Sequence, residues 1–260
     1  MDGPIFGLCS VLTLLSTAIA LYRAVTQRRQ NSDLFRISRR AHVLALASSF
    51  LSSVLAIPTV ADLVDGATTV ELSSLVSHIA AVIFCTSLQV MIIDWEYREL
   101  PHDVNIACRI GFVVVVCGLL IWQFRHTNPA RLDVELDLSY AEFNEVRTYL
   151  LTYLGFFATA GAEVAMRAAK LARAVWRQGR AAGAGLAVAA AGAALGVLYA
   201  VSRGGYVLAF EHGHTWPLPL DNLISPTLEG LSILGIAAGL SMAVLSNHRR
   251  PAVLRRGVNL

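Results

Sequence analysis

Charged residues are scarce in this sequence, and lysine is almost absent. Only 15% of the 260 residues are charged, and Lys170 is the single lysine among 21 basic residues. Soluble domains average nearer a quarter charged residues, so an ordinary soluble domain is excluded. The last apolar segment contains no lysine, which excludes a retinal Schiff base of the rhodopsin kind.

Motifs of common enzyme classes are also missing. The sequence has no HExxH, no GxSxG and no Walker-type glycine-rich loop. The four cysteines show no CxxC spacing, so we expect buried thiols rather than a disulfide framework or a zinc site. The stretch "FEHGHTW" (211, 212 and 214 are its Glu and two His) offers too few donors for a proper zinc site. We therefore expect no enzyme activity, no cofactor and no metal.

What the sequence does contain is apolar residues gathered into long blocks. Hydrophobic residues make up 55% of the chain, and mean hydropathy is +0.58. Each block is near the roughly 20 residues that cross about 30 Å of hydrocarbon. The sequence predicts an all-α polytopic membrane protein with one seven-helix domain, residues 1–248, and a basic cytoplasmic tail, residues 249–260. The predicted spans are residues 5–22, 42–60, 75–95, 103–124, 146–168, 181–201 and 223–245.

The basic residues predict how the chain is threaded. The first apolar block has no basic residue before it and is followed by "ALYRAVTQRR", so we expect an uncleaved helix with its N-terminus outside. Segments 23–40, 96–109, 167–180 and 246–260 then hold 17 Lys and Arg, against four in the outer segments. This is a strong positive-inside signal. Because topology explains the basic residues, no nucleic-acid partner is expected. Abundant Ala and Arg favour a high-GC bacterium, hence a plasma membrane.

Glu163 is the most unusual candidate residue, because it lies in the apolar stretch "FATAGAEVAMRAAK". An ionised carboxylate in hydrocarbon is costly, so such residues usually face protein or water. Arg167 follows four residues later, at the spacing of a helical ion pair. Two interpretations stay open: a structural ion pair near the inner membrane surface, or a group that handles protons or cations.

The third span carries a polar stripe. His78, Cys85, Gln89 and Glu96 are spaced seven, four and seven residues apart, so they share one helix face. A polar stripe in a spanning helix is expected to face the bundle interior. It would either form hydrogen bonds between helices or line a polar cavity.

A second polar group is predicted near the outer end of the bundle. Glu229 and Ser232 share a face of the seventh span, and His78 lies at a similar depth. We expect these side chains to ring an outward-opening ligand pocket, with Arg147 and Arg203 near its rim.

Two small-xxx-small steps predict close helix contacts. "GAALG" contains Gly192 and Gly196, and "GIAAG" contains Gly235 and Gly239. Such steps let helix backbones approach closely. We expect packing between spans six and seven within one chain, with a homo-oligomer contact as the alternative.

Three stretches carry a resemblance to a known family. They are "LTYLGFFATAGAEVAMRAAKLARAVW", "LYAVSRGGYVL" after an Ala/Gly-rich helix, and "LEGLSILGIAAGLSMAVL". With the early "RISRRAHVLALASSFLSSVLAIP", they resemble an actinobacterial family of seven-helix membrane proteins described as transporters or integral membrane regulators. Longer members carry a C-terminal cytoplasmic domain, so the resemblance implies a short member. The family has no established catalytic residues to carry over.

The sequence leaves two functional hypotheses from different classes. In the first, the bundle binds a small or lipophilic ligand and transports or senses it. In the second, the protein is a non-enzymatic scaffold or regulatory subunit whose Arg-rich inner loops, 23–40 and 167–180, dock a cytoplasmic protein or anionic lipid. A transporter requires a polar path through the bundle, whereas a scaffold is compatible with a closed core.

Overall fold

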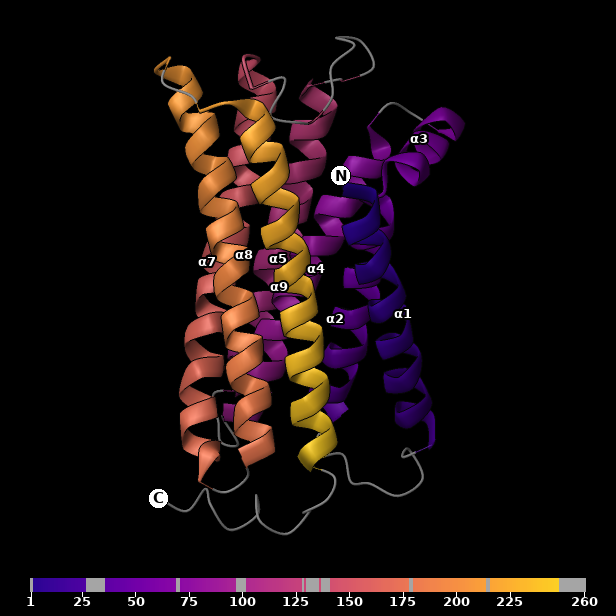
Figure 1. Ribbon diagram of the computed structural model, residues 1–260, viewed down its shortest axis with the longest axis vertical. Coiled ribbons are helices and arrows are strands. Elements are labelled where there is room, and N and C mark those ends of the chain that lie inside the picture. Colours follow the sequence, from indigo (N-terminus) through magenta and orange to yellow (C-terminus); the bar gives the residue numbers. More distant parts are fainter. Residues whose placement is uncertain are drawn as a thin grey trace.

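The protein is a bundle of long helices, shown in Figure 1. The computed structural model describes residues 2–26, 36–68, 71–96, 102–127, 129, 136, 141–177, 180–213 and 216–247. Within these ranges the regular secondary structure is helical, as the sequence predicts. The helices are α1 (Asp2–Thr26), α2 (Arg36–Leu55), α3 (Pro58–Ala67), α4 (Leu72–Glu96), α5 (His102–Thr127), α7 (Asn144–Trp176), α8 (Arg180–Glu211) and α9 (Leu218–Asn247).

Six of the described helices are long and apolar enough to cross a membrane on their own: α1, α4, α5, α7, α8 and α9. The pair α2 and α3 passes the same test only when taken together, and its two helices meet at 85°. The described residues therefore contain six membrane-length helices, or seven if the bent pair is counted as one span. Helices of this length and hydropathy indicate an integral, multi-pass membrane protein.

The predicted second span, residues 42–60, is not one straight helix. α2 ends at Leu55, and α3 begins at Pro58. Proline disfavours helical backbone at the preceding residue, and Ile57 is extended, with φ −80° and ψ 118°. Proline itself fits the first turn of a helix, where its missing N–H is not needed. The chain therefore changes direction between α2 and α3, just before Pro58. In Figure 1, α3 projects from the end of the bundle.

α4 lies at the centre of the bundle. Of its most apolar 18-residue stretch, 72% is buried, compared with 17% in α5. α2 runs antiparallel to α4, because Ser38 meets Asp94 at one end and Ser52 meets Ser77 at the other. The exposed apolar faces of α1 and α5 (Leu15 and Val115, for example) match a lipid environment.

α8 and α9 approach each other through the glycines singled out in the sequence. A Cβ atom on Gly192 would lie 2.7 Å from the backbone nitrogen of Ile236. A Cβ atom on Gly235 would lie 3.0 Å from Gly192 Cα, and one on Gly196 2.7 Å from Ser232 Oγ. Gly239 faces the backbone of Gly185 and Ala189 in the same way. All four glycines therefore serve a contact within the chain.

Substituting Gly192 with Ala is expected to destabilise the bundle, because the added methyl group meets backbone atoms rather than a flexible side chain. Overpacking of this kind costs about 1–3 kcal/mol. The measurement is the midpoint of thermal unfolding in detergent micelles. The control is Gly118→Ala in α5, where a Cβ atom would meet nothing within 4 Å and the helix is expected to gain stability. Equal midpoints for the two variants would contradict the close α8–α9 contact.

Candidate functional site

Glu163 on α7 is the central residue of a polar cluster that connects three helices. Gln89 Nε2 on α4 donates a hydrogen bond of 2.7 Å to Glu163 Oε2. The Arg109 guanidinium on α5 reaches both carboxylate oxygens, at 2.8 Å and 2.6 Å. Arg167 Nε, one turn further along α7, donates to Glu163 Oε1 at 2.8 Å. The carboxylate is thus compensated from its own helix and from two others.

The cluster continues to the end of α4. Arg167 Nη1 forms a second ion pair with Glu96 Oε2. We call the five residues Gln89, Glu96, Arg109, Glu163 and Arg167 the Glu163 cluster. Its two carboxylates and two guanidiniums cancel in formal charge, and 18–28% of each charged side chain is exposed. Such a network ties α4, α5 and α7 together at one end of the bundle.

The sequence predicted part of this cluster. The Glu163–Arg167 pair is present, and two members of the polar stripe, Gln89 and Glu96, reach it. Arg109 was counted only as a basic residue of an inner segment. α5 starts at His102, so Arg109 lies about two turns inside that helix. That depth is the signal that could have marked it as a partner for a buried carboxylate.

His78, the third stripe residue of interest, packs against aromatic residues of α7. Its Nδ1 lies 2.9 Å from the hydroxyl oxygen of Tyr149, and its ring stacks on Tyr153 with 4.1 Å between centroids. Both tyrosines are buried. Phe157 lies one turn beyond Tyr153 on α7, and its ring centroid is 5.9 Å from that of Tyr199 on α8. His78 therefore faces α7, and the sequence analysis missed its two tyrosine neighbours.

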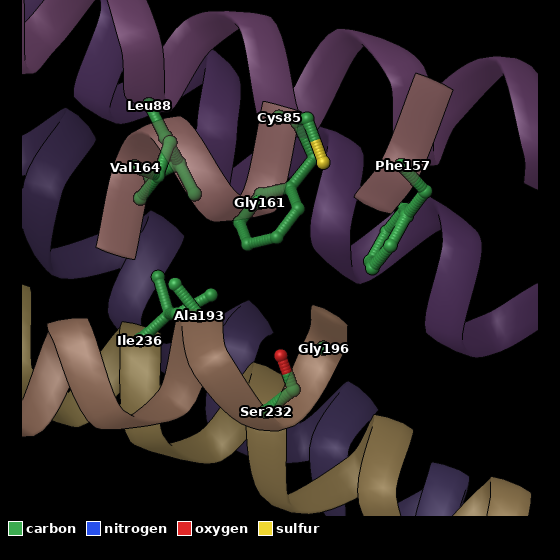
Figure 2. Close-up of a pocket in the computed structure, with 10 residues that line it drawn as sticks. Cys85, Leu88, Phe157, Gly161, Val164, Ala193, Gly196, Ser232 and Ile236 are labelled. Atoms are coloured by element: carbon green, nitrogen blue, oxygen red, sulfur yellow. The ribbon is translucent and has the colours of Figure 1, made fainter. Parts of the chain in front are cut away.

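Two small pockets lie in the middle of the bundle. Figure 2 shows the first, with Cys85 and Leu88 of α4 and Phe157 of α7 facing Gly196 and Ser232. Its volume is about 10 Å³, enough for roughly one water molecule. It is lined almost entirely by apolar atoms.

The second pocket adjoins the first and is more polar. Ser49 and Ser52 of α2 and Glu229 and Ser232 of α9 line it, together with apolar residues of α4 and α7. Its volume is also about 10 Å³. We call it the serine pocket. It brings together Glu229 and Ser232, as predicted, and adds two serines of α2.

Of the predicted outer constellation, Glu229 and Ser232 line the serine pocket. His78 is not among the residues that line the serine pocket. The Arg147 guanidinium donates to Asn144 on its own helix at 2.9 Å, and Arg203 lies 5.9 Å from the ring of Tyr199. Gln89 and Glu163 belong to the Glu163 cluster instead.

The described residues hold no group of three or more His, Cys, Asp and Glu side chains that could bind a metal ion. All four cysteines are free; Cys9 and Cys85 are buried, and Cys108 is exposed. His212 Nδ1 is 3.0 Å from the Leu208 carbonyl oxygen. The side chains of residues 211 and 214, the other donors of "FEHGHTW", lie outside the described part of the chain.

Comparison of the chain with known protein families, curated proteins and solved structures gives no match. The candidate sites are therefore interpreted from their own geometry and chemistry. That geometry places charge compensation at one end of the bundle and, further along it, a small, mostly apolar pocket that includes serine side chains and Glu229.

Replacing Glu163 with Gln is expected to destabilise the protein, because Arg109 then loses its carboxylate partner in a partly desolvated site. Removing one member of such a pair costs about 1–3 kcal/mol when the site is partly exposed. Thermal unfolding in detergent measures the loss, and a double-mutant cycle with Arg109→Gln measures the coupling. Glu145→Gln, at an exposed position of the same helix, is the matched control. Additive effects of the two cluster substitutions would contradict the assigned ion pair.

Proposed function

We propose that the bent pair α2 and α3 forms one span, which gives seven crossings with the N-terminus outside and the C-terminus in the cytoplasm. The Glu163 cluster supports this threading, because Glu96, Arg109 and Arg167 meet at one end of the bundle. Segments 96–109 and 167–180, which end or begin there, belong to the Arg-rich set. α3 then lies at the outer surface, where its exposed Leu63 contacts the lipid headgroup region.

We further propose that the protein is a ligand-responsive membrane bundle, a sensor or transporter, whose inner end is held closed by the Glu163 cluster. The observation that carries this proposal is that one carboxylate ties α4, α5 and α7 at that end. The serine pocket lies on the outer side of the cluster, since Phe157, which lines it, precedes Glu163 by about 9 Å along α7, and the first pocket extends from Phe157 to the depth of the cluster at Val164. A ligand that entered the pockets from outside would be stopped from moving further inward by the Glu163 cluster.

Opening such a closed end requires a change in the ion pairs. Salt-bridge networks between helices have two discrete states, paired and separated, and therefore suit a two-state element. No catalytic step is proposed for Glu163, because both of its oxygens are engaged by guanidinium groups. The resemblance to the actinobacterial seven-helix family agrees with this role and stays a proposal.

A scaffold is the second candidate function. It is favoured by the small volume of the two pockets and by the length of α7, which continues beyond the Glu163 cluster to Trp176. That extension carries exposed Arg173 and Arg177, which fit an acidic protein surface or an anionic lipid.

Thiol labelling of Cys85 tests the closed inner end. Cys85 is 3% exposed and lines the first pocket, and Cys9, Cys108 and Cys117 are replaced by Ala. In this background Glu163→Gln is expected to increase the rate of labelling by N-ethylmaleimide about tenfold, for about 1.4 kcal/mol of lost closure energy. Glu145→Gln is the control, and gel filtration excludes variants that have unfolded. An unchanged labelling rate in a folded variant would contradict closure of the inner end by the Glu163 cluster and would favour the scaffold.

Labelling from the two sides of the membrane tests the threading. In a cysteine-free background, cysteines at Gln30 and Arg177 are expected to react with a membrane-impermeant maleimide only after the cells are opened. A cysteine at Asp62 of α3 is expected to react in intact cells. If the cysteines at positions 30 and 177 reacted from opposite sides of the membrane, the seven-span topology would be overturned.

A further inference from the structure

The part of α7 that extends beyond the Glu163 cluster presents basic side chains on one helix face. Lys170, Arg173 and Arg177 follow one another at spacings of three and four residues, so they lie on the same side of the helix, and all three are exposed. Arg177, directly after the end of α7, keeps helical backbone with φ −72° and ψ −25°. We call these three residues the basic stripe. It is about 10 Å long.

Neighbouring carboxylates do not balance the charge of the basic stripe. None of its three side chains forms an ion pair or hydrogen bond with another described residue. The sequence contains no acidic residue between Glu163 and Glu211. Glu163 and Glu96, the carboxylates of the Glu163 cluster, are already paired with guanidinium groups. Arg180, the first residue of α8, adds a fourth exposed cation three residues further along the chain.

Exposed apolar side chains border the basic stripe. Met166, one turn before Lys170 on the same face, is 59% exposed. Trp176 is 48% exposed, and its ring packs against α8, because a Cβ atom on Gly183 would lie 2.9 Å from Trp176 Cε3. Tryptophan is enriched at the boundary between membrane and water. The exposed face of α7 therefore changes from apolar to cationic where the helix leaves the hydrocarbon.

This combination fits an anionic phospholipid better than an acidic protein. Guanidinium and ammonium groups both bind phosphate oxygens, Arg in a bidentate manner and Lys as a point charge. The acyl chains of the same molecule would pack along Met166 and against the exposed part of the Trp176 ring. An acidic protein would account for the cations but for neither of the two apolar side chains.

We propose that the basic stripe binds an anionic phospholipid of the cytoplasmic leaflet, with its phosphate on Lys170, Arg173 and Arg177 and its acyl chains against Met166 and Trp176. This inference rests on the proposed threading, which places this end of α7 at the cytoplasmic surface. It also identifies the partner of the surface that the scaffold hypothesis uses. A lipid bound there fixes the depth in the membrane of the helix that carries the Glu163 cluster.

Thermal unfolding of the full chain in neutral detergent tests the site, with dioleoylphosphatidylglycerol compared with dioleoylphosphatidylcholine and with inorganic phosphate. A ligand that binds only the folded state raises Tm. We expect phosphatidylglycerol at a hundred times its Kd to raise Tm by about 5–10 °C, and the other two ligands to raise it much less. An equal rise with phosphatidylcholine would overturn the need for an anionic headgroup, and an equal rise with inorganic phosphate would overturn a lipid as the ligand.

Matched variants locate the binding. Lys170→Gln and Arg173→Gln are each expected to weaken phosphatidylglycerol binding about fivefold, and Arg173→Lys, which keeps the charge, is expected to weaken it less. Arg125→Gln is the control, because it removes one charge from an exposed position about 24 Å along α5 from Arg109. All of these positions except Arg109 are substituted at the surface, so Tm without lipid is expected to stay unchanged.

Unchanged affinity in a folded variant that combines Lys170→Gln with Arg173→Gln would contradict the site. Selective binding of poly-L-glutamate in place of the lipid would assign the surface to an acidic protein and overturn the proposal. Detergent micelles have no inner and outer side, so these results do not depend on the threading. Failure of the threading shows only in the labelling of positions 30 and 177.

Discussion

The cost of a charge in an apolar surrounding determines how this bundle is assembled. Ion hydration is lost inside a membrane domain, so a carboxylate there needs compensating groups at hydrogen-bonding distance. Glu163 obtains them from Gln89, Arg109 and Arg167. Because the first two lie on other helices, satisfying one side chain fixes the positions of α4 and α5 against α7. The central position of α4 in the bundle follows the same logic, since its polar stripe needs partners on its buried face.

The polar contacts between α4 and α7 also determine their register. His78 meets Tyr149, Gln89 meets Glu163, and Glu96 meets Arg167, at sequence separations of 71, 74 and 71 residues. The nearly constant separation means that the two helices run parallel and in step over almost the full length of α4. A shift of one helical turn would separate all three pairs at once. Hydrophobic packing alone discriminates less well between such registers, because neighbouring turns present similar apolar surfaces.

The sequence predicted the helical class, the approximate helix positions and the buried face of α4, because hydropathy and the 3.6-residue period are local properties. It missed the bend before Pro58, since the apolar run continues across it. It also missed Arg109 as the partner of Glu163, because contacts between helices depend on rotation about each axis, which one chain's pattern does not give. For the same reason the sequence did not show that His78 packs against Tyr149 and Tyr153 of α7.

The parallel pairing of α4 with α7 has a consequence for biogenesis. Gln89 leaves the ribosome 74 residues before Glu163, an interval of about 4–15 s at ordinary elongation rates. During that time the translocon must accept α4 while the polar groups on its future buried face lack their permanent partners. The nascent N-terminal half therefore depends on water, on α2 or on the insertion machinery to shield those groups. We therefore expect translation speed between the two helices to affect the yield of correctly assembled protein.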